Sequence, residues 1–209
     1  EQQLDENILN SFKPDKVVMA TGSMPDMPMI KGLFQSDMEV VTSVDVLENA
    51  DQESTPTGKR VIVLGGGMTG LIAADYIAAL GNEVYVLNRK KSYAEEMSAN
   101  DRYYLRESLK KKSVTLYKNV VIDRFTSDGA EFHISKSQSS NKDGQAAKDD
   151  SILSIDNCDM VVISEKHISI RDMKKFESLT DAEFHFIGDA KSPRHLMYCI
   201  SEAEEIARS

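Results

Sequence analysis

A glycine-rich segment near the middle of the chain has the residue types and spacing that bind a diphosphate. Four apolar residues, Val61–Leu64, lead into the run Gly65-Gly66-Gly67-Met68-Thr69-Gly70, and an apolar-periodic stretch then continues to Leu80 before Gly81. Strand, glycine-rich turn, helix and second strand within about 30 residues form the context in which GxGxxG predicts a dinucleotide site. A tight turn with chance glycines is the alternative interpretation.

Each glycine of the pattern has a physical reason. We expect Gly65 to let the chain turn sharply off the strand, Gly67 to leave room for a pyrophosphate, and Gly70 to let the helix pack closely on the sheet. The helix that follows offers unpaired backbone N–H groups and a partial positive charge at its N-terminus. A diphosphate is therefore the predicted occupant.

The residues after the second strand bear on the choice of coenzyme. An acidic residue there binds the ribose 2′-hydroxyl of NAD, whereas a basic residue accommodates the 2′-phosphate of NADP. This chain has Asn88 followed by Arg89, Lys90 and Lys91. Arg89 can pair with a phosphate through its planar fork, and the lysines add charge. NADP(H) is favoured, with NAD(H) as the alternative if Asn88 binds the hydroxyls and the cations are only solvated.

The pattern of apolar runs and turns predicts an α/β fold around this site. We expect helices over 40–49 (capped by Thr42 or Ser43), 98–112 and 195–207, an extended loop over 24–32, and polar segments at 51–58 and 135–150. The expected strands are 16–20, 114–117, 120–126, 130–135, 152–155, 160–164 and 183–187, besides the two around the glycine-rich turn.

Composition excludes several classes of function. The 209 residues carry a net charge of −9, which argues against a nucleic-acid partner. No apolar segment approaches the roughly 18 residues that span a membrane, and the polar start at Glu1 predicts no signal peptide. Cys158 and Cys199 lie outside any CxxC spacing, which predicts buried thiols, no metal site and a cytoplasmic, reducing compartment.

Four motifs occur in a characteristic order along the chain. They are Val17–Ser23 (VVMATGS), the GGGMTG run, Asp159–Ile163 (DMVVI), and Phe186–Ala190 (FIGDA) with Pro193-Arg194 behind it. This set resembles the C-terminal half of the NADH:flavin oxidoreductases related to 2,4-dienoyl-CoA reductase and trimethylamine dehydrogenase, over essentially the whole chain. The resemblance implies a Rossmann-like FAD/NAD(P)-binding architecture: residues 55–164 form an inserted NAD(P)-binding domain, and 1–54 and 165–209 are two parts of a split FAD-binding domain.

The same resemblance implies cofactors and partners. Thr21, Gly22, Gly188, Asp189 and Ala190 would face FAD, with Asp189 at its ribityl–phosphate part. Read without the family, Gly188–Ala190 is only a strand-to-helix turn with an N-capping Asp. The flavin barrel with FMN, the 4Fe–4S cysteines and the first FAD-binding glycine motif would lie upstream, so this sequence reads as a truncated portion. As such a portion, it is expected to carry no stoichiometric flavin.

One segment departs from the family pattern, and it bears on function. Where the family turns with Ala-x-Gly, this chain has Ser164-Glu165-Lys166-His167-Ile168, without glycine. We interpret His167 as a surface residue and assign no catalytic side chain, because hydride transfer is the chemistry of the cofactors. The predicted function is to position NAD(P)H for hydride transfer to FAD. The alternatives are a structural ADP-binding module and a portion of a disulfide reductase, although no CxxxxC pair is present.

Overall fold

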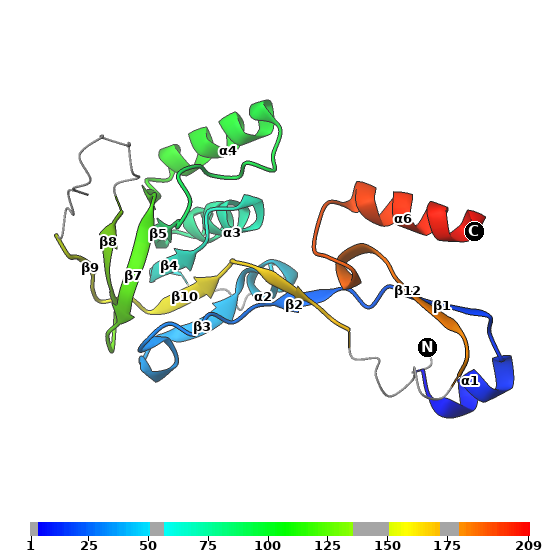
Figure 1. Cartoon of the computed structure of the whole chain (residues 1–209). Helices are drawn as coiled ribbons and strands as arrows, with labels where there is room; N and C mark the ends of the chain where they lie inside the picture. The colour runs from blue at the N-terminus through cyan, green and yellow to red at the C-terminus, as the bar shows by residue number, and fades with distance from the viewer. Residues whose placement is uncertain (1–3, 51–56, 136–150, 172–179) are drawn as a thin grey trace, which may run out of the picture. The chain divides into compact units, whose positions relative to one another are not determined.

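The computed structural model of the chain describes residues 4–50, 57–135, 151–171 and 180–209. They form two compact units (Figure 1). The continuous unit comprises residues 27–165, and the split unit comprises residues 1–26 and 166–209. The chain therefore enters the continuous unit once and then returns to the split unit.

A five-stranded parallel sheet is the centre of the continuous unit. Its strand order is β3-β10-β4-β5-β6, and every neighbouring pair is parallel. The strands are β3 (Glu39–Thr42), β10 (Met160–Ile163), β4 (Arg60–Leu64), β5 (Glu83–Leu87) and β6 (Thr115–Tyr117). Because parallel strands end at one edge, the residues that follow β4, β5 and β10 meet there.

Two layers cover the faces of this sheet. Val61 and Val63 point into a core formed with the helices, whereas Ile62 and Leu64 point into a core on the opposite face. Burial on both faces explains why Val61–Leu64 of β4 is a continuous apolar run without polar alternation. The helices are α2 (Ser43–Glu48), α3 (Met68–Ala79) and α4 (Ala99–Lys111), and the other layer is an antiparallel sheet of β7 (Val120–Phe125), β8 (Ala130–Ile134) and β9 (Leu153–Ile155) (Figure 1).

The split unit is smaller and has two short ladders. Strand β1 (Lys16–Met19) pairs in parallel with β12 (Glu183–Phe186), and β2 (Ser23–Pro25) pairs antiparallel with β11 (His167–Ser169). Helix α1 (Glu6–Phe12) precedes β1, and the 3₁₀ turn η2 (Gly188–Ala190) and helix α6 (Leu196–Arg208) follow β12. Each ladder joins segments from the two ends of the chain.

Most expected elements are confirmed, including the α/β class and the helix over Leu71–Leu80. Three expectations differ from the structure. Residues 39–42 form strand β3, so the helix expected over 40–49 starts only at Ser43, with Thr42 as its N-cap. Residues 23–25 form strand β2 where a loop was expected, and His167–Ser169 forms β11 where no strand was expected. Residues 51–56 and 136–150 lie outside the described residues.

The boundary of the continuous unit also differs from the expected one. The expected insert began at residue 55, but the described residues 27–50 group with the continuous unit. The physical reason is strand pairing: β3 pairs with β10 in the central sheet, and α2 contacts α3. Of the described helices, none is long and apolar enough to cross a membrane.

Candidate dinucleotide-binding site

The glycine turn, Gly65–Gly67, lies between the end of β4 and the start of α3. Gly65 has a φ of +107°, a conformation that favours glycine. A Cβ on Gly65 would lie 2.2 Å from the carbonyl oxygen of Ser164, at the end of the neighbouring strand β10. The sharp turn expected at Gly65 is therefore present, and a second constraint, contact with β10, fixes the residue as glycine.

Gly70 and Gly66 are required by close packing. A Cβ on Gly70 would lie 2.2 Å from the carbonyl oxygen of Gly65, so the first turn of α3 sits directly on the glycine turn, as expected. A Cβ on Gly66 would lie 2.6 Å from the ring of Tyr93 and 2.7 Å from the Asn88 side chain. Tyr93 is buried, and burial raises its pKa to about 12. The loop after β5 thus packs against the glycine turn.

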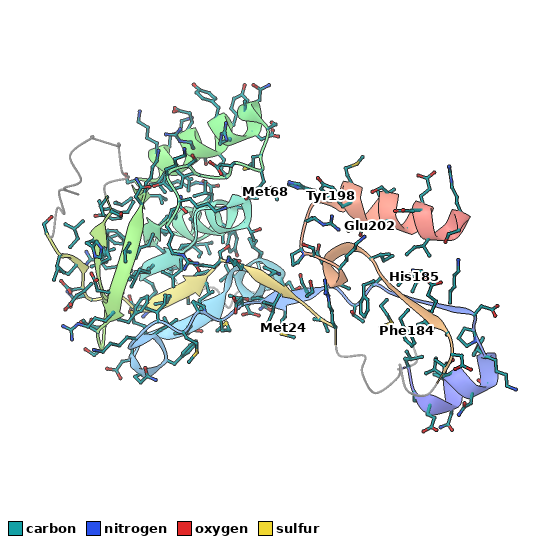
Figure 2. The ribbon with its side chains drawn as sticks, viewed as in Figure 1. Met24, Met68, Phe184, His185, Tyr198 and Glu202 are labelled. Carbon is teal, nitrogen blue, oxygen red and sulfur yellow. The ribbon has the colours of Figure 1, made fainter. Side chains whose placement is uncertain are left out.

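Gly67 is the N-cap of α3 and has no side chain to satisfy the helix's first N–H groups. The carboxylate of Glu96, from the loop after β5, accepts a hydrogen bond from the Met68 N–H. The same oxygen would lie 3.0 Å from a Cβ on Gly67. Met68 is partly exposed (Figure 2) and Thr69 is half-buried. A carboxylate of the chain therefore occupies the helix N-terminus that a pyrophosphate would use.

Asn88 closes the turn after β5. Its side-chain amide donates to the carbonyl oxygens of Lys90 (3.0 Å) and Ser92 (2.7 Å), and its oxygen accepts from the Lys90 N–H (3.3 Å). The residue is only 4% exposed. A contact of Asn88 with a ribose stays a prediction, and it requires these bonds to be exchanged.

Arg89 pairs with a carboxylate from another strand end. Its guanidinium donates to Glu165, which lies two residues beyond the end of β10. The Arg89 side chain is 57% exposed, whereas that of Glu165 is 9% exposed. Lys90 is exposed beside them. The structure therefore brings the glycine turn, Asn88, Arg89 and Lys90 to one edge of the sheet.

The second group of predicted site residues lies in the split unit. The Ser23 hydroxyl donates to Asp189 (3.1 Å) and lies 3.3 Å from Nδ1 of His167. Asp189 also accepts from the Arg194 N–H (3.0 Å), so its carboxylate holds the segment between η2 and α6. His167 is thus half-buried in a hydrogen-bonded chain and differs from the purely surface residue that was expected.

Two further predicted site residues, Thr21 and Gly22, directly precede Ser23 in the sequence. Thr21 donates its hydroxyl to the Ile170 carbonyl oxygen at 2.6 Å. Gly22 has a φ of +76°, and its carbonyl oxygen accepts from the Ile170 N–H at 3.0 Å. Both therefore help to hold the β2–β11 ladder in place beside Asp189.

Glu202, from α6, organises the turn Gly188–Ala190. Its carboxylate, labelled in Figure 2, accepts from the Gly188 N–H (2.8 Å). It also forms ion pairs with Lys191 and Arg194. Burial alone would raise the pKa of Glu202, but these hydrogen bonds outweigh it and lower the pKa to about 2. Gly188 has a φ of +58°, and Ala190 is fully buried. This positioning carboxylate was not predicted from the sequence.

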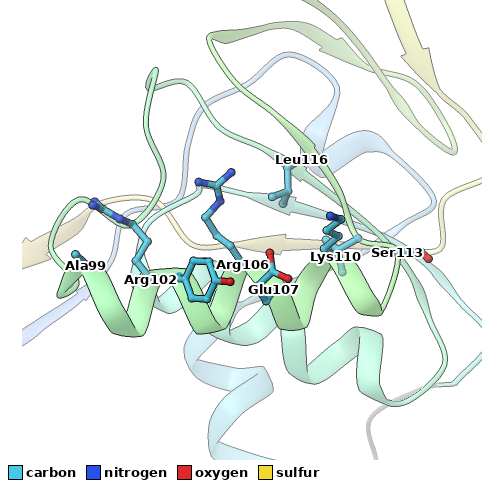
Figure 3. Close-up of a pocket in the computed structure, with 9 residues that line it drawn as sticks. Ala99, Arg102, Arg106, Glu107, Lys110, Ser113 and Leu116 are labelled. Atoms are coloured by element: carbon cyan, nitrogen blue, oxygen red, sulfur yellow. The ribbon is translucent and has the colours of Figure 1, made fainter.

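A hollow of about 690 Å³ lies elsewhere, between α4 and β6 (Figure 3). Arg102, Arg106 and Lys110 line it together with Glu107 and Tyr103. Its lining contains no glycine turn, and the N-terminus of α4, which begins at Ala99, is capped by the Ser98 side chain. Neither it nor any cluster of His, Cys, Asp and Glu in the described residues forms a metal site.

A parallel sheet with a glycine turn at the start of the following helix defines a dinucleotide-binding domain of the Rossmann type. The family model of pyridine nucleotide-disulphide oxidoreductases matches residues 2–164, and the chain belongs to this family.

Relatives place the chain within larger oxidoreductases. It is 26% identical to a cinnamate reductase of Clostridium sporogenes over 98% of this chain and 28% of that protein. It is 31% identical to an NADH oxidase of Thermoanaerobacter brockii over 53% of this chain and 17% of that protein. The chain thus spans less than a third of these relatives.

Solved structures show the same fold. A 2-naphthoyl-CoA reductase superposes with a TM-score of 0.73 at 24% identity, covering 98% of this chain and 28% of that one. A histamine dehydrogenase from Rhizobium superposes with a TM-score of 0.75 at 17% identity, covering 99% of this chain and 32% of that one. The resemblance inferred from the order of motifs, to the C-terminal portion of NADH:flavin oxidoreductases, is confirmed.

Proposed function

We propose that this chain is the nucleotide-binding module of a flavin-dependent NAD(P)H oxidoreductase. The continuous unit would bind NAD(P)H, and the split unit would form part of the site that holds FAD. The names of the relatives support the class of reaction, since they are an NADH oxidase, a cinnamate reductase and an NADH-dependent nitrite reductase. The substrate would bind to parts that the relatives have beyond the matched segment.

The start of α3 is the observation that carries this proposal. At Gly67 the nearest atom to an added Cβ is the Glu96 carboxylate oxygen, which belongs to a flexible side chain. The Met68 N–H beside it already binds an anionic oxygen. Backbone N–H groups at a helix N-terminus bind phosphate oxygens in the same way. The residues present therefore fit the diphosphate of a dinucleotide.

The split unit fits one end of an FAD site. Gly188–Ala190 follows a parallel strand, and its backbone is held by Glu202 while Asp189 is held by Ser23 and Arg194. We assign residues 1–26 and 166–209 to a split FAD-binding domain that further polypeptide completes. FMN and a 4Fe–4S centre, if present in the whole protein, would lie in that further polypeptide.

The side chains of this chain would bind and orient. Nicotinamide and flavin supply hydride transfer when bound, and the protein contributes position. The glycine turn would hold the pyrophosphate, and the loop with Asn88, Arg89 and Lys90 would border the adenosine ribose. No side chain needs to act as an acid or base in this step.

A titration with NADH, NADPH and ADP tests the proposal. Gly67 has an ordinary φ of −73°, so Gly67→Ala should fold while its methyl blocks the diphosphate. We expect at least about tenfold weaker binding of both coenzymes, the equivalent of about 1.4 kcal/mol. The melting temperature should fall only slightly, because Ala is a weaker N-cap residue than Gly. The control is Ala79→Ser, at the exposed other end of α3. Equal affinities for the variant and the wild type would reject the site.

Two alternatives have distinct outcomes. A structural ADP module would bind ADP as tightly as NADPH, and NADH would not bleach the flavin absorbance of the whole protein under anaerobic conditions. A disulfide reductase would consume NAD(P)H with a small disulfide as acceptor. The described chain has two free cysteines, Cys158 and Cys199, and such an activity would need a redox pair from another segment.

A further inference from the structure

The ion pair between Arg89 and Glu165 spans the end of the central strand. Arg89 follows β5 and Glu165 follows β10, and these two strands flank β4 on either side. The pair therefore bridges the sheet edge across the glycine turn. Arg89 is also the cation that the sequence offers to a 2′-phosphate, so Glu165 competes with that phosphate for one guanidinium.

The side chain of Glu165 is more buried than that of Arg89, so breaking the ion pair costs Glu165 more than it costs Arg89. Glu165 is 9% exposed at its side chain, and Arg89 is 57% exposed. Breaking the ion pair costs a carboxylate largely removed from water more than it costs an exposed guanidinium, which is solvated in any case. Withdrawal of Arg89 toward a phosphate would break this ion pair and place a second anion next to the Glu165 carboxylate.

We propose that Glu165 sets the coenzyme choice of this chain by holding Arg89. The inference rests on the proposed nucleotide site and deepens it. While Arg89 is paired with Glu165, its guanidinium is not available to a 2′-phosphate, and NADH binds at least as well as NADPH despite the charge of Lys90. Once Glu165 is made neutral, Arg89 becomes available and NADPH is preferred. The preference for NADP(H) expected from Asn88, Arg89 and Lys90 alone is thereby cancelled.

The test is calorimetric titration of the whole protein with NADH and with NADPH. For the wild type we expect an NADPH affinity no greater than that for NADH. Glu165→Gln keeps the shape of the side chain and should tighten NADPH binding about tenfold while changing NADH less than twofold. Adding Arg89→Ala should abolish this gain.

A matched control separates this effect from a general change of charge. Glu131→Gln breaks the Arg124–Glu131 pair (2.7 Å) between β7 and β8, away from the glycine turn, and removes the same charge. It should leave the NADPH-to-NADH affinity ratio unchanged. A rise in both affinities in Glu165→Gln, or the same change in Glu131→Gln, would overturn the inference.

Arg89→Ala alone keeps the inference falsifiable if Glu165→Gln does not fold. Because Arg89 is already engaged, its removal should leave the NADPH-to-NADH ratio within about twofold. A tenfold fall in that ratio would show that Arg89 reads the phosphate despite Glu165. Failure of the proposed function gives a different result, because then neither the wild type nor any variant binds either coenzyme.

Discussion

The glycine-containing turns of the two units are stabilised by different kinds of interaction. In the continuous unit, the glycine turn follows a strand whose residues Ile62, Val63 and Leu64 are fully buried between two layers. In the split unit, Gly188–Ala190 is held by polar contacts, and the adjoining helix α6 exposes Leu196 and Met197, each 73% accessible. Apolar packing therefore fixes the first turn, and ion pairs and hydrogen bonds fix the second.

This difference indicates whether each unit needs further polypeptide to bury its apolar residues. The core of the continuous unit is formed by its own residues, although its surface also carries exposed apolar side chains such as Met29 and Ile152. The described part of the split unit has a small core around Leu9 and Met19, and the exposed apolar residues of α6 also include Tyr198 and Ile200. Further polypeptide over these residues would complete its burial, in agreement with the split FAD-binding domain proposed above.

The largest effect is expected at Gly65, where packing leaves no room. Gly65→Ala combines a φ of +107° with a Cβ 2.2 Å from the Ser164 oxygen, and should lower the free energy of unfolding by more than about 4 kcal/mol. Gly81→Ala is the control, with a φ of +83° and no atom within 4 Å, and should cost about 1–2 kcal/mol. Urea unfolding followed by circular dichroism measures both, and equal losses would contradict tight packing at the turn.

Both thiols were expected to be buried, but only Cys158 lies in a core, whereas Cys199 is partly buried. Burial raises the pKa of Cys158 to about 12, so very little thiolate exists at pH 8, whereas Cys199 in α6 is partly accessible. We expect N-ethylmaleimide to label Cys199 at least about tenfold faster than Cys158 in the native protein. Mass spectrometry of peptides measures the rates. Both should react alike in concentrated urea, and equal native rates would contradict the contrast.

Acid should destabilise the turn Gly188–Ala190 before it destabilises the glycine turn of the continuous unit. The folded pKa of Glu202, about 2, lies below its ordinary value of 4.5. Its carboxylate therefore stabilises the fold above about pH 4.5, and this contribution is lost as the pH falls toward 2. Hydrogen exchange should show α6 amides losing protection between about pH 4.5 and about pH 2, relative to α3 amides.

Glu202→Gln should remove that pH dependence by destabilising α6 at neutral pH. Glu204→Gln is the matched control, because Glu204 is an exposed residue of the same helix that pairs only with Arg208 among the contacts described. A loss of protection that is unchanged in Glu202→Gln would assign the acid effect to another group.

The smallest effect is expected at Glu96. Glu96→Gln removes the negative charge at the start of α3, and binding of both NADH and NADPH should tighten about fivefold, since a charge at a helix terminus contributes about 0.3–1 kcal/mol. Glu95→Gln makes the same charge change at an exposed neighbour and should have little effect. The two variants are compared by titration, and equal gains would indicate a long-range charge effect.

The sequence predicted elements whose signals are local. The βαβ unit around Gly65–Gly70 was predicted because apolar runs, glycines and the helix end at Gly81 follow one another directly. Strands β2, β3 and β11 were missed or displaced because each has three or four residues and is defined by pairing with a distant segment, as β3 is with β10. The boundary at residue 27 follows from that same pairing.

The carboxylates of the site could not be predicted for a similar reason. Glu96 binds Met68, 28 residues away, Glu165 binds Arg89, 76 residues away, and Glu202 binds Gly188, 14 residues away. No spacing rule relates such residues, because the contacts exist only once the strands are ordered in the sheet. Glu165 was visible in the sequence only as part of a segment that lacks the family's glycine.

The inward-facing amide of Asn88 has a consequence for protein engineering. An Asp or Glu at the end of the second strand binds the ribose 2′-hydroxyl of NAD, so its introduction is an obvious way to change coenzyme preference. In this chain an acid at position 88 would face the carbonyl oxygens of Lys90 and Ser92, which now accept hydrogen bonds from the amide. The loop would open before a ribose was reached. A designer who wants a switch of coenzyme should leave Asn88 in place and vary the pair formed by Arg89 and Glu165.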